Sequence, residues 1–155
     1  MQPLFIIRSS NGNVGHDIEG GDTMAERVRV TTGSPWEPLV GYCRAIRVGN
    51  QVEVAGTTAM QDGQVVGVND AYAQTTYILQ VISDALNQVG ASLSDVVRTR
   101  MFVTDITNWE EIGRAHGEFF RDICPVSTMV EVKALIDPAL LVEIEVQAIV
   151  TDTVV

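Results

Sequence analysis

A run of apolar residues with helical spacing limits the possible folds of this chain more than any other feature. The apolar residues of this run recur at intervals of three and four, at Ile78, Val81, Ile82, Ala85, Leu86 and Val89. Asn69 or Asp70 can cap the start of a helix, and Gly90 supplies a typical stop. The pattern therefore predicts an amphipathic helix from about residue 70 to residue 89, with one face packed on a second layer.

Two short apolar runs precede this helix. Residues 42–48 and 51–55 are separated by Gly49-Asn50, a dipeptide that tolerates the positive φ of a tight turn. This arrangement predicts a β-hairpin. The segment 56–67 is rich in Gly, Thr, Gln and Asp, which favours a loop.

Strand and helix patterns alternate after residue 90. Residues 95–104 have the period of a strand, and Thr107 and Glu110 fit a capping box for a helix that runs to about Phe120. After Pro125, residues 128–135 form a second apolar run, and residues 140–150 alternate again. The order ββαβαββ predicts an α+β fold with two helices on one side of a mixed sheet.

The second face of this sheet carries mixed side chains. The strand pattern places Val97, Thr99, Met101 and Val103 on one face, and the residues expected on the other face are Arg98, Arg100, Phe102, Glu143 and Glu145. Such residues are costly to bury alone and unusual to leave wholly exposed. A subunit interface would resolve the conflict, so we expect an oligomer with small-ligand clefts near the subunit seams.

Length and charge set further limits. The chain has 155 residues, as expected for one domain, and a net charge of −10, which disfavours nucleic acid and anionic lipid surfaces as partners. The longest apolar runs are too short to span a membrane. Residues 1–23 have no regular period and no signal-peptide pattern, so we expect a poorly ordered extension or a mis-assigned start, followed by a single domain over residues 24–155.

The cysteines and histidines offer little catalytic chemistry. Cys43 and Cys124 lack a metal-binding spacing and are expected to be reduced, buried structural thiols of a cytoplasmic protein. His116 is the single histidine of the expected domain, and it suits packing or a solvent-facing position better than the role of a base. The sequence therefore predicts neither a metal site nor a Ser-His-Asp triad. It also contains no Gly-rich phosphate loop.

Three segments resemble the Rid family, also called YjgF or endoribonuclease L-PSP-like. They are GYCRAIRVGNQVEVAGTT (41–58), GASLSDVVRTRMFVTDITNWEEIGRAHGEFF (90–120) and PVSTMVEVKALIDPALLVEIEVQAIV (125–150). Their shared order and spacing make the resemblance specific for the fold. The resemblance implies a chorismate-mutase-like subunit and a homotrimer with sheets inside, helices outside and clefts between subunits.

The resemblance also implies a chemistry and a set of site residues. Members of the best-known branch hydrolyse 2-imino and enamine acids to 2-keto acids and ammonia without a cofactor. Glu143 matches the glutamate that orients water in that branch, and Tyr42 matches an aromatic residue at the start of the hairpin. Met129 stands where a backbone amide meets the ligand. Ser127 occupies the position of an arginine that binds the substrate carboxylate.

The serine at position 127 leaves the activity open. One neutral hydroxyl replaces a bidentate arginine contact worth about 1.5 to 3 kcal/mol, so the usual 2-imino acids should bind poorly. Arg98 and Arg100 are candidate replacements. Three hypotheses follow: a Rid-type hydrolase or deaminase with another substrate, a non-catalytic trimer that binds a small ligand or stabilises a partner, and, more remotely, an endoribonuclease.

Overall fold

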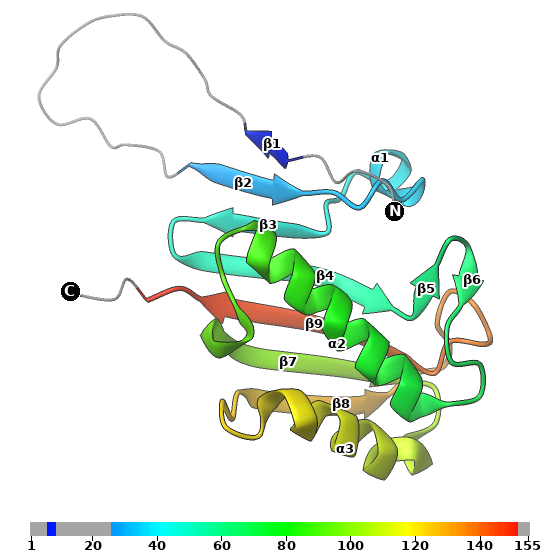
Figure 1. Cartoon of the computed structure of the whole chain (residues 1–155). Coiled ribbons are helices and arrows are strands. Elements are labelled where there is room, and N and C mark those ends of the chain that lie inside the picture. Colours follow the sequence, from blue (N-terminus) through cyan, green and yellow to red (C-terminus); the bar gives the residue numbers. More distant parts are fainter. Residues whose placement is uncertain (1–5, 9–25, 152–155) are drawn as a thin grey trace, which may run out of the picture.

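The architecture is one main sheet with the two long helices on one face (Figure 1). The structure, a computed structural model, describes residues 6–8 and 26–151. The seven strands of the sheet, in spatial order, are β1 (Ile6–Arg8), β2 (Arg27–Val30), β3 (Ala45–Val48), β4 (Gln51–Thr58), β9 (Val142–Ile149), β7 (Val96–Val103) and β8 (Val126–Glu131). The strands β7 and β8 pair in parallel and the other neighbours are antiparallel, so the sheet is mixed, as predicted.

Two helices cover one face of this sheet. They are α2 (Ala71–Gln88) and α3 (Trp109–Phe120), and both cross the same side of the strands in Figure 1. The succession β3, β4, α2, β7, α3, β8, β9 reproduces the predicted order ββαβαββ, which confirms the fold class. A short helix, α1 (Trp36–Val40), and a small hairpin, β5 (Met60–Gln61) with β6 (Gln64–Val65), were not predicted. Two 3₁₀ turns, Leu93–Asp95 and Ile106–Asn108, precede β7 and α3.

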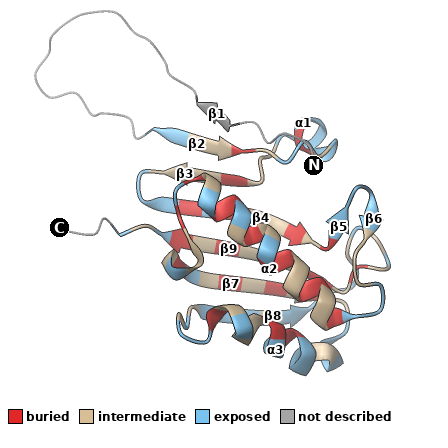
Figure 2. Ribbon diagram, viewed as in Figure 1, coloured by how far each residue is buried: buried red, intermediate tan, exposed pale blue. Residues whose placement is uncertain are grey.

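The core lies between the sheet and the helices. Most of the predicted apolar stripe of α2 is buried, with Ile78, Ile82 and Leu86 fully enclosed against inward-facing residues of β4, β7 and β9 (Figure 2), while Val81 is half-buried. The Asp70 carboxylate accepts a hydrogen bond from the Ala73 amide, 2.8 Å away, so one of the two predicted caps is used. Within the described residues, no helix combines the length and the apolar character needed to cross a bilayer.

Three local predictions were wrong. The strand β4 continues to Thr58, and the small hairpin follows it where a loop was expected. Thr107 does not cap α3; it lies in a 3₁₀ turn, where Asp105 accepts hydrogen bonds from the Thr107 amide and hydroxyl. Val97 is exposed because the register of β7 against β9 shifts between Val96 and Arg98.

The structure also bears on the expectations for the N-terminal extension and for the two cysteines. Ile6–Arg8, which belong to the expected extension, pair antiparallel with β2 and form the edge of the sheet. The rest of that extension lies outside the described residues, so its status stays a prediction. Cys43 and Cys124 are both free thiols, but Cys124 is exposed and Cys43 is half-buried, so neither is enclosed as expected.

Candidate active site on the uncovered sheet face

Glu143 lies on β9, on the sheet face that the helices leave uncovered. Its register neighbours are Thr58 of β4 and Phe102 of β7. The register of β4 shifts between Val54 and Thr57, and the Glu143 carboxylate fills the space that a side chain at Gly56 would need. The bulge and the missing side chain of Gly56 together make room for this carboxylate inside the sheet surface.

The surroundings of Glu143 disfavour its charge. Burial raises the pKa of its carboxyl group, the neighbouring Glu145 raises it further, and the Arg44 guanidinium partly opposes both. A carboxyl group with a raised pKa is a stronger base once it is ionised, and it titrates closer to neutral pH than an exposed one. Glu143 is therefore a candidate general base or water-orienting group.

Arg44 is the residue of this site that the sequence analysis missed. Its Nη1 donates hydrogen bonds to the carbonyl of Gly56 at 2.8 Å and to the hydroxyl of Thr57 at 3.0 Å. Its guanidinium carbon lies 6.0 Å from the centre of the Tyr42 ring, within range of a cation–π contact. Its Nε is buried without a hydrogen-bond partner. Arg44 thus connects Tyr42 to the bulge against which Glu143 packs.

The two arginines proposed as replacements share the uncovered face with Glu143. In the register of β7 with β9, Arg98 is opposite Gln147 and Arg100 is opposite Glu145. The Arg100 Nε forms a salt bridge with the Glu145 carboxylate. Arg100 is therefore already paired with an acid. The sequence offered one signal for Arg44, a cation two residues after Tyr42, and this signal was not recognised.

Ser127 and Met129 lie on the other face. Ser127 of β8 is the register partner of the buried Thr99, and the two hydroxyl oxygens are 2.9 Å apart. Met129 is half-buried and packs against the core beneath the helices. Within one chain, the register therefore places Arg98, Arg100 and Glu143 on one face of the sheet and the Ser127 and Met129 side chains on the other, while Tyr42 contacts Arg44.

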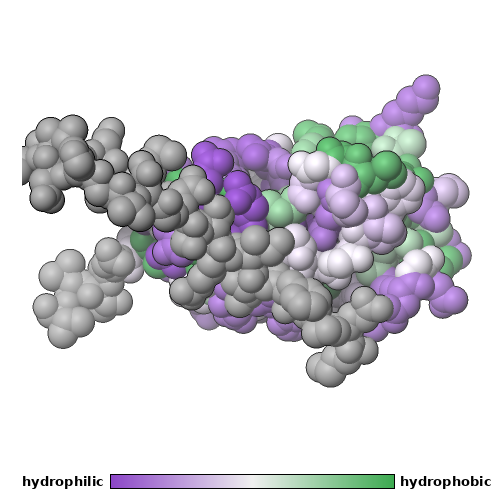
Figure 3. All heavy atoms as spheres, turned by 90° about the horizontal axis from the view of Figure 1, so that it is seen from above, coloured by the Kyte–Doolittle hydropathy of each residue, from purple (hydrophilic) through white to green (hydrophobic). Residues whose placement is uncertain are grey.

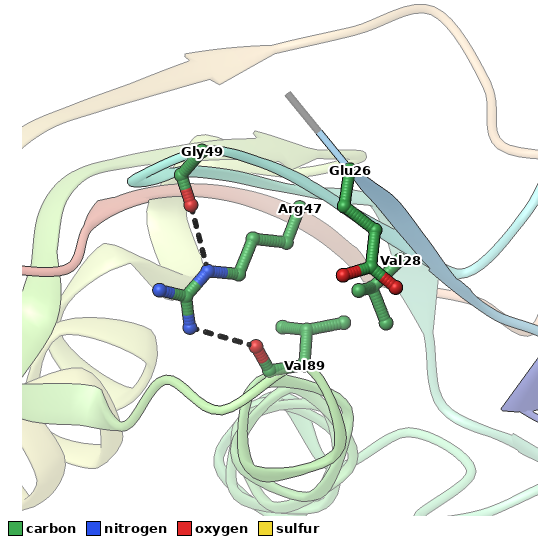
Figure 4. A pocket seen from close by; sticks show the side chains of 5 residues that line it. All are labelled: Glu26, Val28, Arg47, Gly49 and Val89. Carbon is green, nitrogen blue, oxygen red and sulfur yellow. Dashed lines mark hydrogen bonds between the residues drawn. The ribbon is translucent and has the colours of Figure 1, made fainter. Parts of the chain in front are cut away.

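Two pockets formed by the described residues lie away from Glu143. A pocket of about 340 Å³ is lined by Glu26, Val28, Arg47, Gly49 and Val89 (Figure 4). The Nε and Nη1 of its arginine are held by backbone, because they donate to the carbonyls of Gly49 at 2.8 Å, Val89 at 3.1 Å and Gly90 at 2.9 Å. This arginine caps the C-terminal end of α2 and has a structural role. A smaller pocket of about 220 Å³ lies between Arg44 and α2, and Glu143 lines neither pocket.

The described residues offer no metal-binding cluster: residues 6–8 and 26–151 contain no group of three or more His, Cys, Asp or Glu side chains able to hold an ion. The chemistry that the site can perform with its own groups is proton transfer at Glu143 and anion binding at nearby arginines.

The fold and this site define a small α+β domain with an acid set into an otherwise uncovered sheet face. The family model described as Endoribonuclease L-PSP matches residues 32–150. The chain belongs to this family, the Rid or YjgF family, as its sequence predicted.

Relatives with known names and structures agree with this assignment. The chain is 33% identical over 122 residues to the 3-aminoacrylate deaminase RutC of Acinetobacter baylyi, covering 78% of this chain and 95% of RutC. It is 52% identical to Rv2704 of Mycobacterium tuberculosis, a member of the YjgF/YER057c/UK114 family, covering 80% of this chain and 99% of that one with a TM-score of 0.73. The Rid family protein YyfA of Yersinia pestis is 33% identical, covering 70% and 87%, with a TM-score of 0.66.

Proposed function

We propose that this protein is a cofactor-free deaminase of a small imine or enamine acid, working in clefts between the subunits of a homotrimer. The reaction adds water to the C=N carbon of the imine and releases ammonia, leaving a carbonyl group. The observation that carries the proposal is the Glu143 carboxylate, set against Gly56 on the uncovered face with a raised pKa. The name of the related RutC, a 3-aminoacrylate deaminase, supports the same class of substrate.

Glu143 would supply the proton transfer. Its ionised carboxylate would accept a proton from the attacking water, and the resulting acid would return a proton to the departing nitrogen. Partial burial favours both steps, because it lowers the cost of the protonated form and keeps the carboxyl group near the pH at which it must act.

The substrate carboxylate needs a cation, and Ser127 does not provide one. Among the arginines that the structure describes, Arg44 is the one whose charge lowers the pKa of Glu143. Arg98 remains a second candidate, whereas Arg100 is bound to Glu145. We therefore assign the carboxylate to Arg44, with Tyr42 beside it.

The trimer is supported by surfaces that one chain leaves uncovered. The face with Glu143 has no helix over it (Figure 1), and α1 exposes Trp36, Leu39 and Val40 directly before Tyr42. Seen from the side of β2 and α1, hydrophobic residues gather at the end of the molecule where α1 lies (Figure 3). Packing of these surfaces against a second chain would bury them and complete a cleft beside Tyr42.

Ammonia release tests the activity. A 2-imino acid, generated in situ from its amino acid by an oxidase, and 3-aminoacrylate should each lose ammonia faster with the protein than without it. Glu143→Gln should return the rate to the uncatalysed one, while Glu53→Gln, a change of an exposed acid on the same face, should leave it intact. Sedimentation should give three times the mass of the 16.8 kDa chain.

The second candidate is a non-catalytic trimer that binds a small ligand. The neutral Ser127 favours it, because loss of a carboxylate-binding arginine weakens substrate binding more than it weakens the fold. Ligand binding in the absence of any ammonia release, unchanged by Glu143→Gln, would establish this function in place of the first.

A further inference from the structure

The pocket beside the C-terminal end of α2 brings together two opposite charges from neighbouring segments. Val28 of β2 is the register partner of Arg47 of β3, and Glu26 lies two residues before Val28, which places its side chain on the same side. Val89, directly after α2, lines the pocket from the helix side (Figure 4). The volume of about 340 Å³ is at the lower end of the range of about 300 to 1,000 Å³ that small-molecule sites occupy.

Arg47 is held in place and keeps part of its guanidinium free. Its Nε and Nη1 donate to the carbonyls of Gly49, Val89 and Gly90, and these contacts fix the plane of the group. Its Nη2 donates to no described residue, and the three acceptors of the other nitrogens are neutral carbonyl groups. Arg47 is therefore an oriented cation with the two N–H hydrogens of Nη2 still available.

The acid of the pocket is not paired with this cation. Glu26 and Arg47 line the same pocket, yet the structure shows no ion pair between them. Figure 4 shows the Glu26 carboxylate and the Arg47 guanidinium on two sides of the pocket, with the Val28 and Val89 side chains between them. Opposite charges that are held apart in this way leave one position for an anionic group and another for a cationic group.

These groups select among small ligands. A phosphate or a dicarboxylate carries excess negative charge that Glu26 repels, and a simple amine leaves the Arg47 guanidinium without an acceptor. An α-amino acid has one carboxylate and one ammonium group, and a small apolar side chain can pack on Val28 and Val89. We propose that the pocket binds a small apolar α-amino acid, with its carboxylate at the Arg47 Nη2 and its ammonium group at Glu26. This site is separate from Glu143 and does not depend on the proposed deaminase activity.

Binding here connects three segments of the chain. A ligand that bridges Glu26 and Arg47 joins the start of β2 to the hairpin turn and to the end of α2, because Arg47 already holds the turn and the helix end. A ligand that binds the folded state alone stabilises it. Hydrogen exchange of the Gly49 and Gly90 amides should therefore slow when the amino acid is present.

L-Valine and two analogues test the site on the full-length protein. Isobutylamine lacks the carboxylate of valine, and isovalerate lacks its ammonium group. In ¹H–¹⁵N NMR titrations, valine should shift the amide signals of Val28, Gly49 and Gly90, and each analogue should bind about tenfold more weakly, as expected for the loss of one charge-assisted contact. Equal binding of valine and isovalerate would overturn the proposal. So would valine-induced shifts centred on Tyr42 and Glu143 with none at Gly49.

Glu26→Gln tests the acid with little change of shape. The dissociation constant of valine should rise about tenfold, while that of isovalerate stays within a factor of two. Glu53→Gln removes an exposed acid from the uncovered sheet face and should change neither constant. Arg47 is tested from the ligand side, through isobutylamine, because its replacement would also release the end of α2.

An unchanged valine constant in Glu26→Gln would contradict the position assigned to the ammonium group. The titrations need no catalysis. If the protein releases no ammonia, the proposed deaminase fails, whereas valine binding at this pocket still decides the present inference.

Discussion

The carboxylate of Glu143 occupies the space in which a side chain at Gly56 would lie. The two residues belong to neighbouring strands, β9 and β4, at the point where the register of β4 shifts. The obstacle to a larger residue is the far end of a flexible side chain, so the position of the acid and the stability of the sheet can be separated by mutation.

Gly56→Ala should displace the Glu143 carboxylate and leave the fold intact. We expect ammonia release to fall by roughly tenfold or more, since a displaced catalytic group loses its alignment, while Tm changes by less than about 4 °C. Gly113→Ala is the matched control. A methyl group there meets open space on α3, so it should stabilise the protein by about 0.5 to 1 kcal/mol without changing turnover. Full activity in Gly56→Ala would contradict the role of Glu143.

Glu143→Gln should raise the free energy of unfolding at neutral pH while it abolishes turnover. The folded state raises the pKa of this carboxyl group, so the unfolded chain gives up the proton more readily. The parent protein therefore loses unfolding free energy as the pH rises through the folded-state pKa of Glu143, and it has no such loss below about pH 4. Chemical denaturation across pH 4 to 8 should show a gain for Glu143→Gln that grows with pH. A gain of equal size at every pH would exclude this origin.

Arg44→Leu should raise the pKa of Glu143 further. The guanidinium lowers that pKa, and its loss leaves burial and Glu145 unopposed. The acidic limb of the pH–rate profile should shift to higher pH, and KM for a substrate carboxylate should rise about tenfold with the loss of a charge-assisted contact. Arg27→Leu, which removes an exposed cation from β2, serves as the control and should shift neither quantity.

Gln74→Leu should destabilise the protein by about 3 kcal/mol. Gln74 has an exposed fraction of 0%, donates to the carbonyls of Gly67 at 3.1 Å and Ala139 at 2.9 Å, and accepts from the Leu141 amide at 2.8 Å. Its loss would leave three backbone groups without partners in the interior. Chemical denaturation of Gln80→Leu, at an exposed position of the same helix, gives the reference. A similar loss of unfolding free energy in both variants would refute the stabilising role of the Gln74 hydrogen bonds.

Ser127→Arg should improve turnover of 2-imino acids. Ser127 is exposed at the edge strand β8, so a long cationic side chain can extend outward without entering the core. A guanidinium there would bind a carboxylate more strongly than one hydroxyl. The control Gln61→Arg places the same charge at an exposed position of the small β5–β6 hairpin. An equal effect of both variants would assign the gain to overall charge.

The fold could be predicted because its elements have clear periods and limits. The stripe of α2, the cap at Asp70 and the alternation of β9 each reflect a repeating pattern of buried positions, and the order of these elements restricts the topology. The helix α1 was missed because it is five residues long and exposes most of its apolar side chains. Its length and exposure leave no amphipathic period to detect.

The site was less accessible to sequence analysis because it depends on departures from regular geometry. Glu143 was identified from its motif, but its contact with Gly56 arises from a bulge that no period indicates. Arg44 was overlooked because it lies before the observed start of β3, although residues 42–48 were expected to form a strand, and because its contacts are made with the irregular part of β4.

Arg47 has a consequence for how the molecule opens. By holding the Gly49 turn and the last carbonyls of α2 with one guanidinium, it couples the β3–β4 hairpin to the end of a helix some forty residues later. Local fraying of that helix end then requires the hairpin turn to be released as well. Amide hydrogens in both segments should exchange with solvent in a single cooperative event, which makes this corner one folding unit.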